Sequence, residues 1–163
     1  RCGLFGVAVN QDGRSSTLTA PNGPSQATVM RVALAEAKLA PEEVVHMECH
    51  GTGTPLGDPI EIGGLKSINA SRTEDRPLIL AAVKSNCGHL EGPAASTGLI
   101  KSVALMEHLS SMSSIHLCTL NPSIAALSDL PALFATESLP MASKVLSRLG
   151  GGLSSFGFGG TNA

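Results

Sequence analysis

Apolar residues along the chain gather into short runs of the length expected of buried strands. The clearest runs are Val44–Met47 and Leu78–Val83, each bounded by polar or proline residues. Leu4–Val9 is a similar run, and turn residues follow it at Asn10–Gly13. Weaker runs follow, and the pattern predicts further short strands over Ile115–Leu120, Leu133–Ala135 and Arg148–Phe156.

Three helices are predicted between these runs. Pro24 opens the first, which runs to about Leu39 and places four small or apolar residues on one face: Val29, Val32, Ala33 and Ala37. The second begins with Asp58 as the N-cap and Pro59 at the first helical position, and it continues to Asn69. The third extends from Pro93 to His108 and carries Leu99, Val103 and Met106 at helical spacing. Helical turns are expected at Pro41–Glu43 and after Asn121.

Strands that alternate with helices predict an α/β fold built from βαβ units. A chain of 163 residues with no long linker and no internal repeat suggests one domain with a real core. The net charge of −2 provides no basic patch, which argues against nucleic-acid binding. No apolar run reaches the length of about 18 residues that a membrane span needs, so no membrane insertion is expected.

Two strand ends carry the candidate chemistry. His50 follows the run Val44–Met47 and precedes a loop that contains three glycines and leads into a helix start. The second run, Leu78–Val83, leads in the same way to Lys84-Ser85-Asn86-Cys87-Gly88-His89. A neutral imidazole can donate one N–H to a developing oxyanion if its other nitrogen is held by a second group. We therefore expect the rings of His50 and His89 to lie close enough to share one substrate oxygen.

Three motifs in register resemble a known family. The first motif is His50–Thr54 together with Gly57–Glu61, the second is Lys84–His89, and the third is Gly157–Asn162. In this order and at these intervals the chain resembles the β-ketoacyl synthase (ketosynthase) domain of modular type I polyketide synthases. The similarity runs from Val9 to the last residue, so it covers nearly the whole chain.

The resemblance implies a thiolase-like α/β fold, layered α-β-α-β-α in the full domain, and a decarboxylative Claisen condensation of malonyl-type units with acyl thioesters. It implies that His50 and His89 hold the malonyl thioester carbonyl and stabilise the enolate formed when carbon dioxide leaves. It places Lys84, with Asp58 and Glu61, in the polar support of the two histidines. On spacing alone, Asp58 and Glu61 are explained equally well as a capping box.

Further roles come from the resemblance alone. Thr52 and Thr54 would line the channel for the pantetheine arm of an acyl carrier protein. The backbone N–H of Phe158 would complete an oxyanion hole, and its ring would gate the acyl pocket. No metal and no directly bound cofactor are implied, because the substrate is carried on the phosphopantetheine of the carrier protein. A homodimer in the full domain and a cytoplasmic or plastid location are also expected.

The nucleophile of the family has no counterpart in this sequence. Ketosynthases carry an acyl-accepting cysteine in an Ala-Cys-Ser-Ser context well before the position of Val9, and none of the four cysteines has that setting: Cys2, Cys49, Cys87 and Cys118. We therefore expect residues 1–163 to be the C-terminal half of a ketosynthase domain, inactive alone. Alternation along the chain could bring Cys87 to the face of His89, but the resemblance puts an aliphatic residue there, so Cys87 is expected to be a packing residue.

Two other sites fit the motifs poorly. A dinucleotide-binding loop is disfavoured because Gly51, Gly53 and Gly57 are spaced one residue too widely and a histidine leads them. A zinc site from Cys49-His50 and Cys87-x-His89 is disfavoured because adjacent strand residues point to opposite faces. Within the fold, a fatty-acid condensing enzyme is the alternative to a polyketide synthase. A module that binds acyl thioesters without condensing them is the alternative of a different class.

Overall fold

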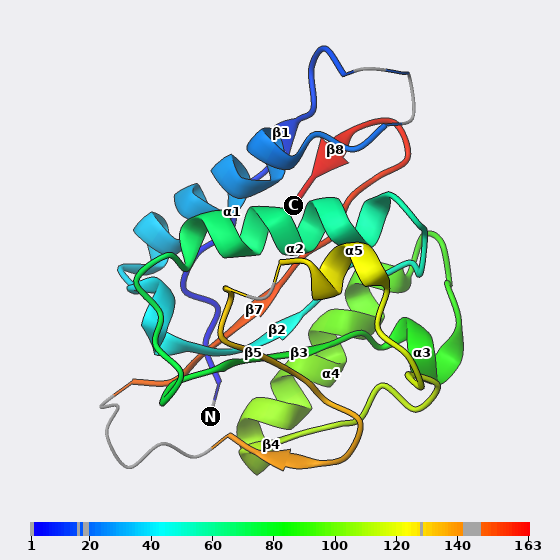
Figure 1. Ribbon diagram of the computed structural model, residues 1–163. Helices are drawn as coiled ribbons and strands as arrows, with labels where there is room; N and C mark the ends of the chain where they lie inside the picture. Colours follow the sequence, from blue (N-terminus) through cyan, green and yellow to red (C-terminus); the bar gives the residue numbers. More distant parts are fainter. Residues whose placement is uncertain (1, 16, 18–19, 128, 142–147) are drawn as a thin grey trace.

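A parallel sheet of four strands lies at the centre of the computed structural model, in the order β5-β3-β2-β7 (Figure 1). The structure describes residues 2–15, 17, 20–127, 129–141 and 148–163. The strands of this sheet are β2 (Val44–Glu48), β3 (Leu78–Ala81), β5 (Ala132–Phe134) and β7 (Gly150–Leu153). The four strands predicted at these places are confirmed. Because β2 and β3 are parallel neighbours, their C-terminal ends lie at the same edge of the sheet.

Helices cover both faces of this sheet, and the three long ones agree with the prediction. Helices α1 (Gly23–Ala37) and α2 (Gly57–Ile68) pack together on one face. Helix α4 (Ala94–His108) lies on the other face, against β7. The short elements are the turn η1 (Pro41–Glu43), the helices α3 (Lys84–Cys87) and α5 (Pro122–Ala125), and two strand pairs, β1 (Asn10–Gln11) with β8 (Thr161–Asn162) and β4 (Ser110–Ser111) with β6 (Leu139–Pro140).

The alternation of side chains along each strand divides the core in two. Leu78 and Leu80 of β3 belong to a cluster that contains residues of α1, α2 and α5. Ile79 and Ala81 belong to a second cluster that contains Leu105 of α4. One face of the sheet therefore carries the larger apolar core, and the other carries a smaller one beneath α4.

The predicted strand over Leu4–Val9 is wrong. This segment has no strand partner among the described residues, and pairing begins only at Asn10 and Gln11, opposite β8. Four of its side chains are more than half exposed: Leu4, Phe5, Val7 and Val9. A strand needs a neighbour to bond its backbone, and only the two residues of β8 supply one here.

Two further expectations are corrected. No strand forms over Ile115–Leu120, where the chain makes turns instead. Of the three apolar residues noted on the third helix, only Met106 packs against the core, because Leu99 and Val103 are 43% and 41% exposed. Helix α4 turns a different set toward the sheet, namely Gly98, Lys101, Ser102 and Leu105. On α1, Val29 is buried as expected but Val32 is exposed.

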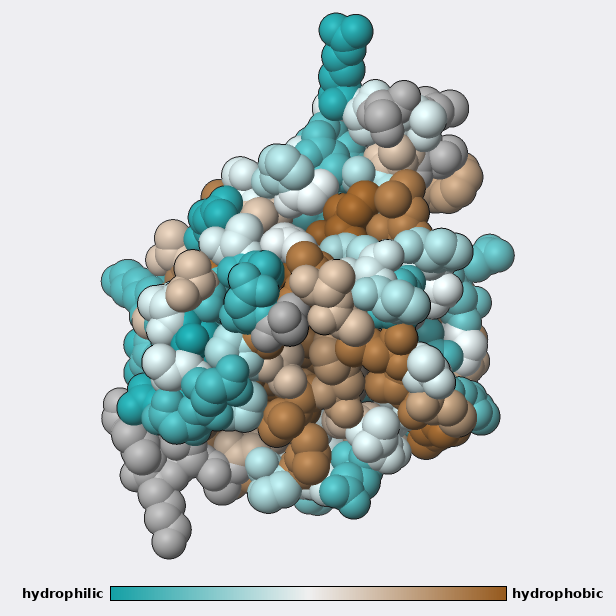
Figure 2. Space-filling view, in the orientation of Figure 1, coloured by the Kyte–Doolittle hydropathy of each residue, from teal (hydrophilic) through white to brown (hydrophobic). Residues whose placement is uncertain are grey.

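Apolar surface is visible on the outside of the molecule as well. Figure 2 shows apolar residues gathered across the middle of one face, with polar residues around them. Within the described ranges, no helix combines the length and apolar character needed to span a membrane.

Candidate active site

The two histidines predicted to act together lie side by side. His50 lies two residues beyond the end of β2, and His89 follows the short helix α3, which starts just beyond β3. The ring centroids are 6.0 Å apart, and the ring planes are nearly perpendicular at 88°. The expectation that the imidazoles meet on one side of the sheet edge is confirmed, because β2 and β3 are adjacent and parallel.

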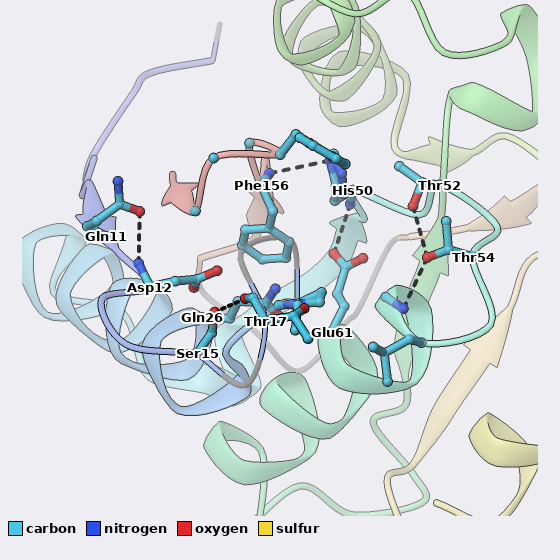
Figure 3. Close-up of a pocket in the computed structure, with 18 of the residues that line it drawn as sticks. Gln11, Asp12, Ser15, Thr17, Gln26, His50, Thr52, Thr54, Glu61 and Phe156 are labelled. Atoms are coloured by element: carbon cyan, nitrogen blue, oxygen red, sulfur yellow. Dashed lines mark hydrogen bonds between the residues drawn. The ribbon is translucent and has the colours of Figure 1, made fainter.

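The loop that carries His50 is held by a buried glutamate. Glu61 of α2 is 2% exposed, and one of its carboxylate oxygens accepts the backbone N–H of His50 at 2.8 Å (Figure 3). The other accepts the backbone N–H of Gly51 at 3.0 Å. Burial raises the pKa of Glu61 to about 7, although these two hydrogen bonds lower it. Gly51 has a φ of +47°, and a Cβ there would lie 2.7 Å from the Cβ of Ala82, so this tight turn requires glycine.

The tautomer of His50 follows from its contacts. The backbone N–H of Phe156 donates to Nδ1 of His50 at 3.3 Å, so the ring proton lies on Nε2. The Phe156 ring packs on the imidazole with 5.6 Å between centroids. Burial, helped by the charge of Lys84, lowers the pKa of His50 to about 4. At neutral pH this ring is therefore an uncharged Nε2–H donor.

His89 shows the same tautomer by a different route. The backbone N–H of Glu91, two residues further on, donates to Nδ1 of His89 at 3.0 Å. The proton of its ring therefore also lies on Nε2. Unlike His50, this side chain is exposed. Each imidazole thus has Nδ1 occupied by a backbone donor and Nε2–H free to donate.

Lys84 is half-buried at the first residue of α3. Burial lowers the pKa of Lys84, and the negative charges of Glu61 and Glu48 act in the opposite direction. Asp58 and Glu61, which the resemblance places beside Lys84, do not form an ion pair with it: among the described residues, Lys84 has no carboxylate within 4.0 Å. The two glutamates therefore act on Lys84 through their charge and not through direct contact.

The expected capping role of Asp58 and Glu61 is wrong. Helix α2 starts at Gly57 after Leu56, and no side chain caps it from the N-cap position. Thr54 serves the helix start instead, because its Oγ1 accepts the N–H of Gly57 at 3.0 Å. Asp58 accepts the N–H of Gly53 at 3.1 Å, so it steadies the glycine loop. Burial raises the pKa of Asp58, against hydrogen bonds that lower it.

A cleft of about 890 Å³ opens in front of the histidines. It is lined by both imidazoles, by Thr52 and Thr54, and by the glycine-rich loop that contains Phe158. Thr52 and Thr54 face each other with 3.5 Å between their hydroxyl oxygens. The Phe158 side chain is 83% exposed, so the phenylalanine in contact with His50 is Phe156.

The cysteines differ from the expectation at one position. Cys49 is buried on the α2 side of the sheet, in the larger core cluster, and burial raises the pKa of its thiol. Cys87 is exposed, which corrects the expectation that it packs in the interior, and its Sγ lies 3.4 Å from the Val83 carbonyl oxygen. Cys2 and Cys118 are also exposed.

The motifs did not point to every residue of the site. Phe156 lies two residues before the residue that the motif emphasised, at the start of the same glycine-rich loop. Glu48 and Lys101 form a buried ion pair behind the site, with 2.8 Å between Nζ and Oε2. The sequence carried a signal that each of these charges is buried, but not that they pair, because Glu48 ends a buried strand and Lys101 lies within the apolar third helix. A charge buried in such a place needs a partner of opposite sign.

The comparisons with known proteins agree with this geometry. Residues 2–117 match the sequence profile described as the beta-ketoacyl synthase, C-terminal domain. The chain belongs to the β-ketoacyl synthase family. The polyketide synthase GfsA of Streptomyces halstedii is 47% identical over 159 residues, which cover 97% of this chain. The spectinabilin polyketide synthase system protein NorB of Streptomyces orinoci is 46% identical over 161 residues, or 98% of the chain.

Solved ketosynthases show the same fold. The ketosynthase from module 6 of the bacillaene synthase of Bacillus subtilis 168 matches 98% of this chain with a TM-score of 0.89 and 31% identity. The oxazolomycin ketosynthase domain OzmH KS7 of Streptomyces albus JA3453 matches 98% with a TM-score of 0.87 and 32% identity. The fold is therefore thiolase-like. The chain spans 29% of each of these solved chains, and 2% and 7% of the two polyketide synthases.

Proposed function

We propose that this chain is the C-terminal part of a polyketide synthase ketosynthase domain, and that it supplies the histidine pair that decarboxylates a malonyl-type thioester. The observation that carries the proposal is the pair of Nε2–H donors. Both Nδ1 atoms accept from backbone N–H groups, and the rings are 6.0 Å apart. Two such donors can bind one carbonyl oxygen at the place where negative charge develops.

The reaction step uses these donors without any redox change. The malonyl thioester carbonyl oxygen accepts from Nε2 of His50 and of His89. The bond between the α-carbon and the carboxylate breaks, carbon dioxide leaves, and the electron pair forms an enolate whose oxygen both imidazoles stabilise. The α-carbon then attacks an acyl thioester on a cysteine thiol, a carbon–carbon bond forms, and the thiolate leaves.

The uncharged state of His50 suits this role. With a pKa of about 4, His50 donates its Nε2–H at neutral pH without first taking up a proton. The half-buried ammonium of Lys84 adds positive charge beside the imidazoles, because Lys84 lowers the pKa of His50 through its charge. Both features favour the transition state over the substrate, because the negative charge of the malonyl carboxylate moves onto the thioester oxygen during the reaction.

The thiol that holds the acyl group comes from outside these residues. Cys49 is buried and its pKa is raised, which disfavours a thiolate. Exposed apolar side chains along the unpaired segment Leu4–Val9 are consistent with a missing neighbour in the same domain. The fraction of the solved ketosynthases that the chain spans, 29%, supports the same view. We therefore expect no condensation by residues 1–163 alone.

The substrate arrives on an acyl carrier protein in this proposal. The cleft in front of the histidines is lined by Thr52 and Thr54, whose hydroxyls suit the amide groups of a phosphopantetheine arm. Phe158 lies at the same cleft, and its exposed ring can close over an acyl chain. The chain itself binds no further cofactor in this mechanism.

The test measures carbon dioxide release from radiolabelled malonyl carrier protein by the complete domain, meaning these residues together with the part that bears the nucleophile. His50→Ala and His89→Ala should each lower the rate by about 100-fold or more, in the range seen for an oxyanion donor, about 10²–10³. The matched control is His116→Ala, because His116 is exposed and does not line the cleft. Decarboxylation that survives both substitutions would contradict the proposal.

A further inference from the structure

A buried ion pair behind the site plays no part in the mechanism above. Lys101 of α4 and Glu48 of β2 lie 2.8 Å apart, and their side chains are only 6% and 1% exposed. Removing two charges from water costs several kcal/mol per ion, which the attraction between them often fails to repay. A gain in stability is therefore a weak explanation for this buried ion pair. Its position in the structure suggests a different role.

The close approach of α4 to the sheet brings the two charges together. At Gly98 of α4, a Cβ would lie 3.3 Å from Cγ of Glu48 and 2.9 Å from a methyl carbon of Leu153. Lys101 follows Gly98 by three residues, so it lies on the same face of α4. Glycine at this position lets the lysine reach the end of β2.

Glu48 also contacts the backbone of the element that carries Lys84. Its Oε1 accepts the N–H of Val83, the residue that directly precedes α3. Its own carbonyl oxygen accepts the N–H of Ser154 at 2.9 Å, two residues before Phe156. Glu48 itself stands two residues before His50. One residue therefore links β2, the start of α3, the strand end that leads to Phe156, and α4.

This arrangement matters most for His89. The exposed His89 ring is held by a backbone donor only two residues away, so its place depends on where the α3 turn lies. Glu48 fixes the start of that turn through Val83, and the charge of Lys101 compensates the buried charge of Glu48. A shift of about 1 Å between a catalytic group and its substrate can cost about 100-fold in rate.

We propose that Glu48 and Lys101 are positioning residues of the decarboxylation site, which set the α3 turn with Lys84 and His89 against His50. The inference rests on the proposed function of the histidine pair. Glu48 acts as the acceptor for Val83 N–H, and Lys101 balances the buried charge of that acceptor, so Lys101 is needed only while residue 48 is a carboxylate. Neither side chain touches the substrate.

The test compares two double variants of the complete domain. Glu48→Leu with Lys101→Met removes both charges, so it leaves no buried charge without a partner, but it also removes the acceptor for Val83 N–H. Glu48→Gln with Lys101→Met removes the same charges and keeps an amide oxygen that can accept. We expect the first to lower kcat for malonyl decarboxylation about tenfold or more with KM within about twofold. The second should stay within about threefold of wild type.

The matched control is Lys66→Met. Lys66 and Asp129 form an ion pair of the same length, 2.8 Å, but Asp129 is 74% exposed and the pair lies away from the cleft. This variant should keep its kcat. All rates are measured well below the melting temperature of each variant, so that they refer to folded protein.

Gly98→Ala provides a second test in case the Glu48→Leu, Lys101→Met double variant does not fold. Gly98→Ala keeps both charges and adds a good helix former, but it places a methyl group against Glu48, and we expect a loss of kcat of about fivefold or more. Equal rates for the two double variants, or an unchanged Gly98→Ala, would overturn the inference.

A readout that needs no catalysis separates this inference from the proposed function. If wild-type protein itself releases no carbon dioxide, the proposed function fails, and amide hydrogen exchange at Val83 then decides the inference. Exchange should be faster in the Glu48→Leu double variant than in the Glu48→Gln double variant, because only the second keeps an acceptor. Equal exchange in the two would overturn the positioning role.

Discussion

The two histidines of the site are held in contrasting ways. His50 is half-buried and is fixed by contacts from distant parts of the chain: Glu61 on α2 binds its backbone, and Phe156 binds its ring nitrogen. His89 is exposed, and its ring nitrogen is held by Glu91, which is only two residues away. The same tautomer is thus produced once by tertiary structure and once by local chain geometry.

The contrast shows where the site is vulnerable. The His50 loop should resist motion, because its anchors belong to α2 and to the loop beyond β7. The placement of His89 depends on the α3 turn as a whole, and therefore on Glu48 and Val83. Changes near His50 should act on both stability and rate, whereas changes near His89 should act mainly on rate.

The largest expected effect is at Glu61. Glu61→Leu leaves the buried N–H groups of His50 and Gly51 without acceptors, which should cost about 3 kcal/mol in the free energy of unfolding. Decarboxylation should fall about 100-fold because His50 is displaced. Glu91→Ala is the control, since Glu91 contributes only its backbone N–H to the site. Chemical denaturation and carbon dioxide release measure both, and equal damage from the two substitutions would contradict the contrast.

The next effect concerns pH and His50. Burial lowers the folded pKa of His50 to about 4 from its ordinary value of 6.5. As pH falls below 6.5, His50 becomes protonated in the unfolded chain but stays neutral in the folded protein. The folded state therefore loses stability until the pH reaches about 4. Because His50 is only half-buried and solvent screens part of the effect, this loss is expected to stay below about 2 kcal/mol. His50→Asn should therefore flatten the fall in melting temperature across this pH range. An unchanged slope would show that His50 already titrates in the folded protein at its usual pKa.

Much of this site could be predicted from the sequence, and the parts that could not be predicted have physical causes. The βαβ pattern placed His50 and His89 at neighbouring strand ends, because parallel strands bring their C-terminal ends to one edge. The role of Glu61 was only half visible. Its position one turn into a helix suggested a capping box. In the structure its buried carboxylate instead accepts backbone N–H groups of the His50 loop.

Other features needed the fold itself. The partnership of Glu48 with Lys101 spans β2 and α4, and nothing local in the sequence connects them. The buried face of α4 could not be identified from its apolar residues, because Gly98 and Lys101, and not Leu99 and Val103, meet the sheet. The segment Leu4–Val9 has the composition of a strand, but a strand also requires a partner along its length.

A smaller effect compares two glycines of the His50 loop. Both Gly51 and Gly53 have positive φ, but a Cβ at Gly51 would lie 2.7 Å from Ala82, whereas a Cβ at Gly53 would meet nothing within 4 Å. Gly51→Ala should therefore be more destabilising than Gly53→Ala by about 1–2 kcal/mol. Thermal unfolding of the two variants measures the difference. Equal losses would mean that the loop is free to move away from β3.

The smallest effect separates the two phenylalanines. Phe156→Leu keeps the backbone N–H that holds His50 but loses the ring contact, which should cost about 1 kcal/mol and lower the rate only a few-fold. Phe158→Leu should change stability by less than about 0.5 kcal/mol, since that side chain lies on the surface. A rate lost entirely in Phe156→Leu would mean that the ring, and not the backbone, positions His50.

The most direct measurement is nitrogen-15 NMR of the histidine side chains in the complete domain at neutral pH, with and without a malonyl thioester analogue that cannot lose carbon dioxide. His50 should be neutral with its proton on Nε2, the Nδ1 of His89 should accept from the Glu91 backbone, and the Nε2–H signals of both rings should move when the analogue binds. A proton on Nδ1 of either ring, or a response from only one of the two, would contradict the shared binding of one oxygen.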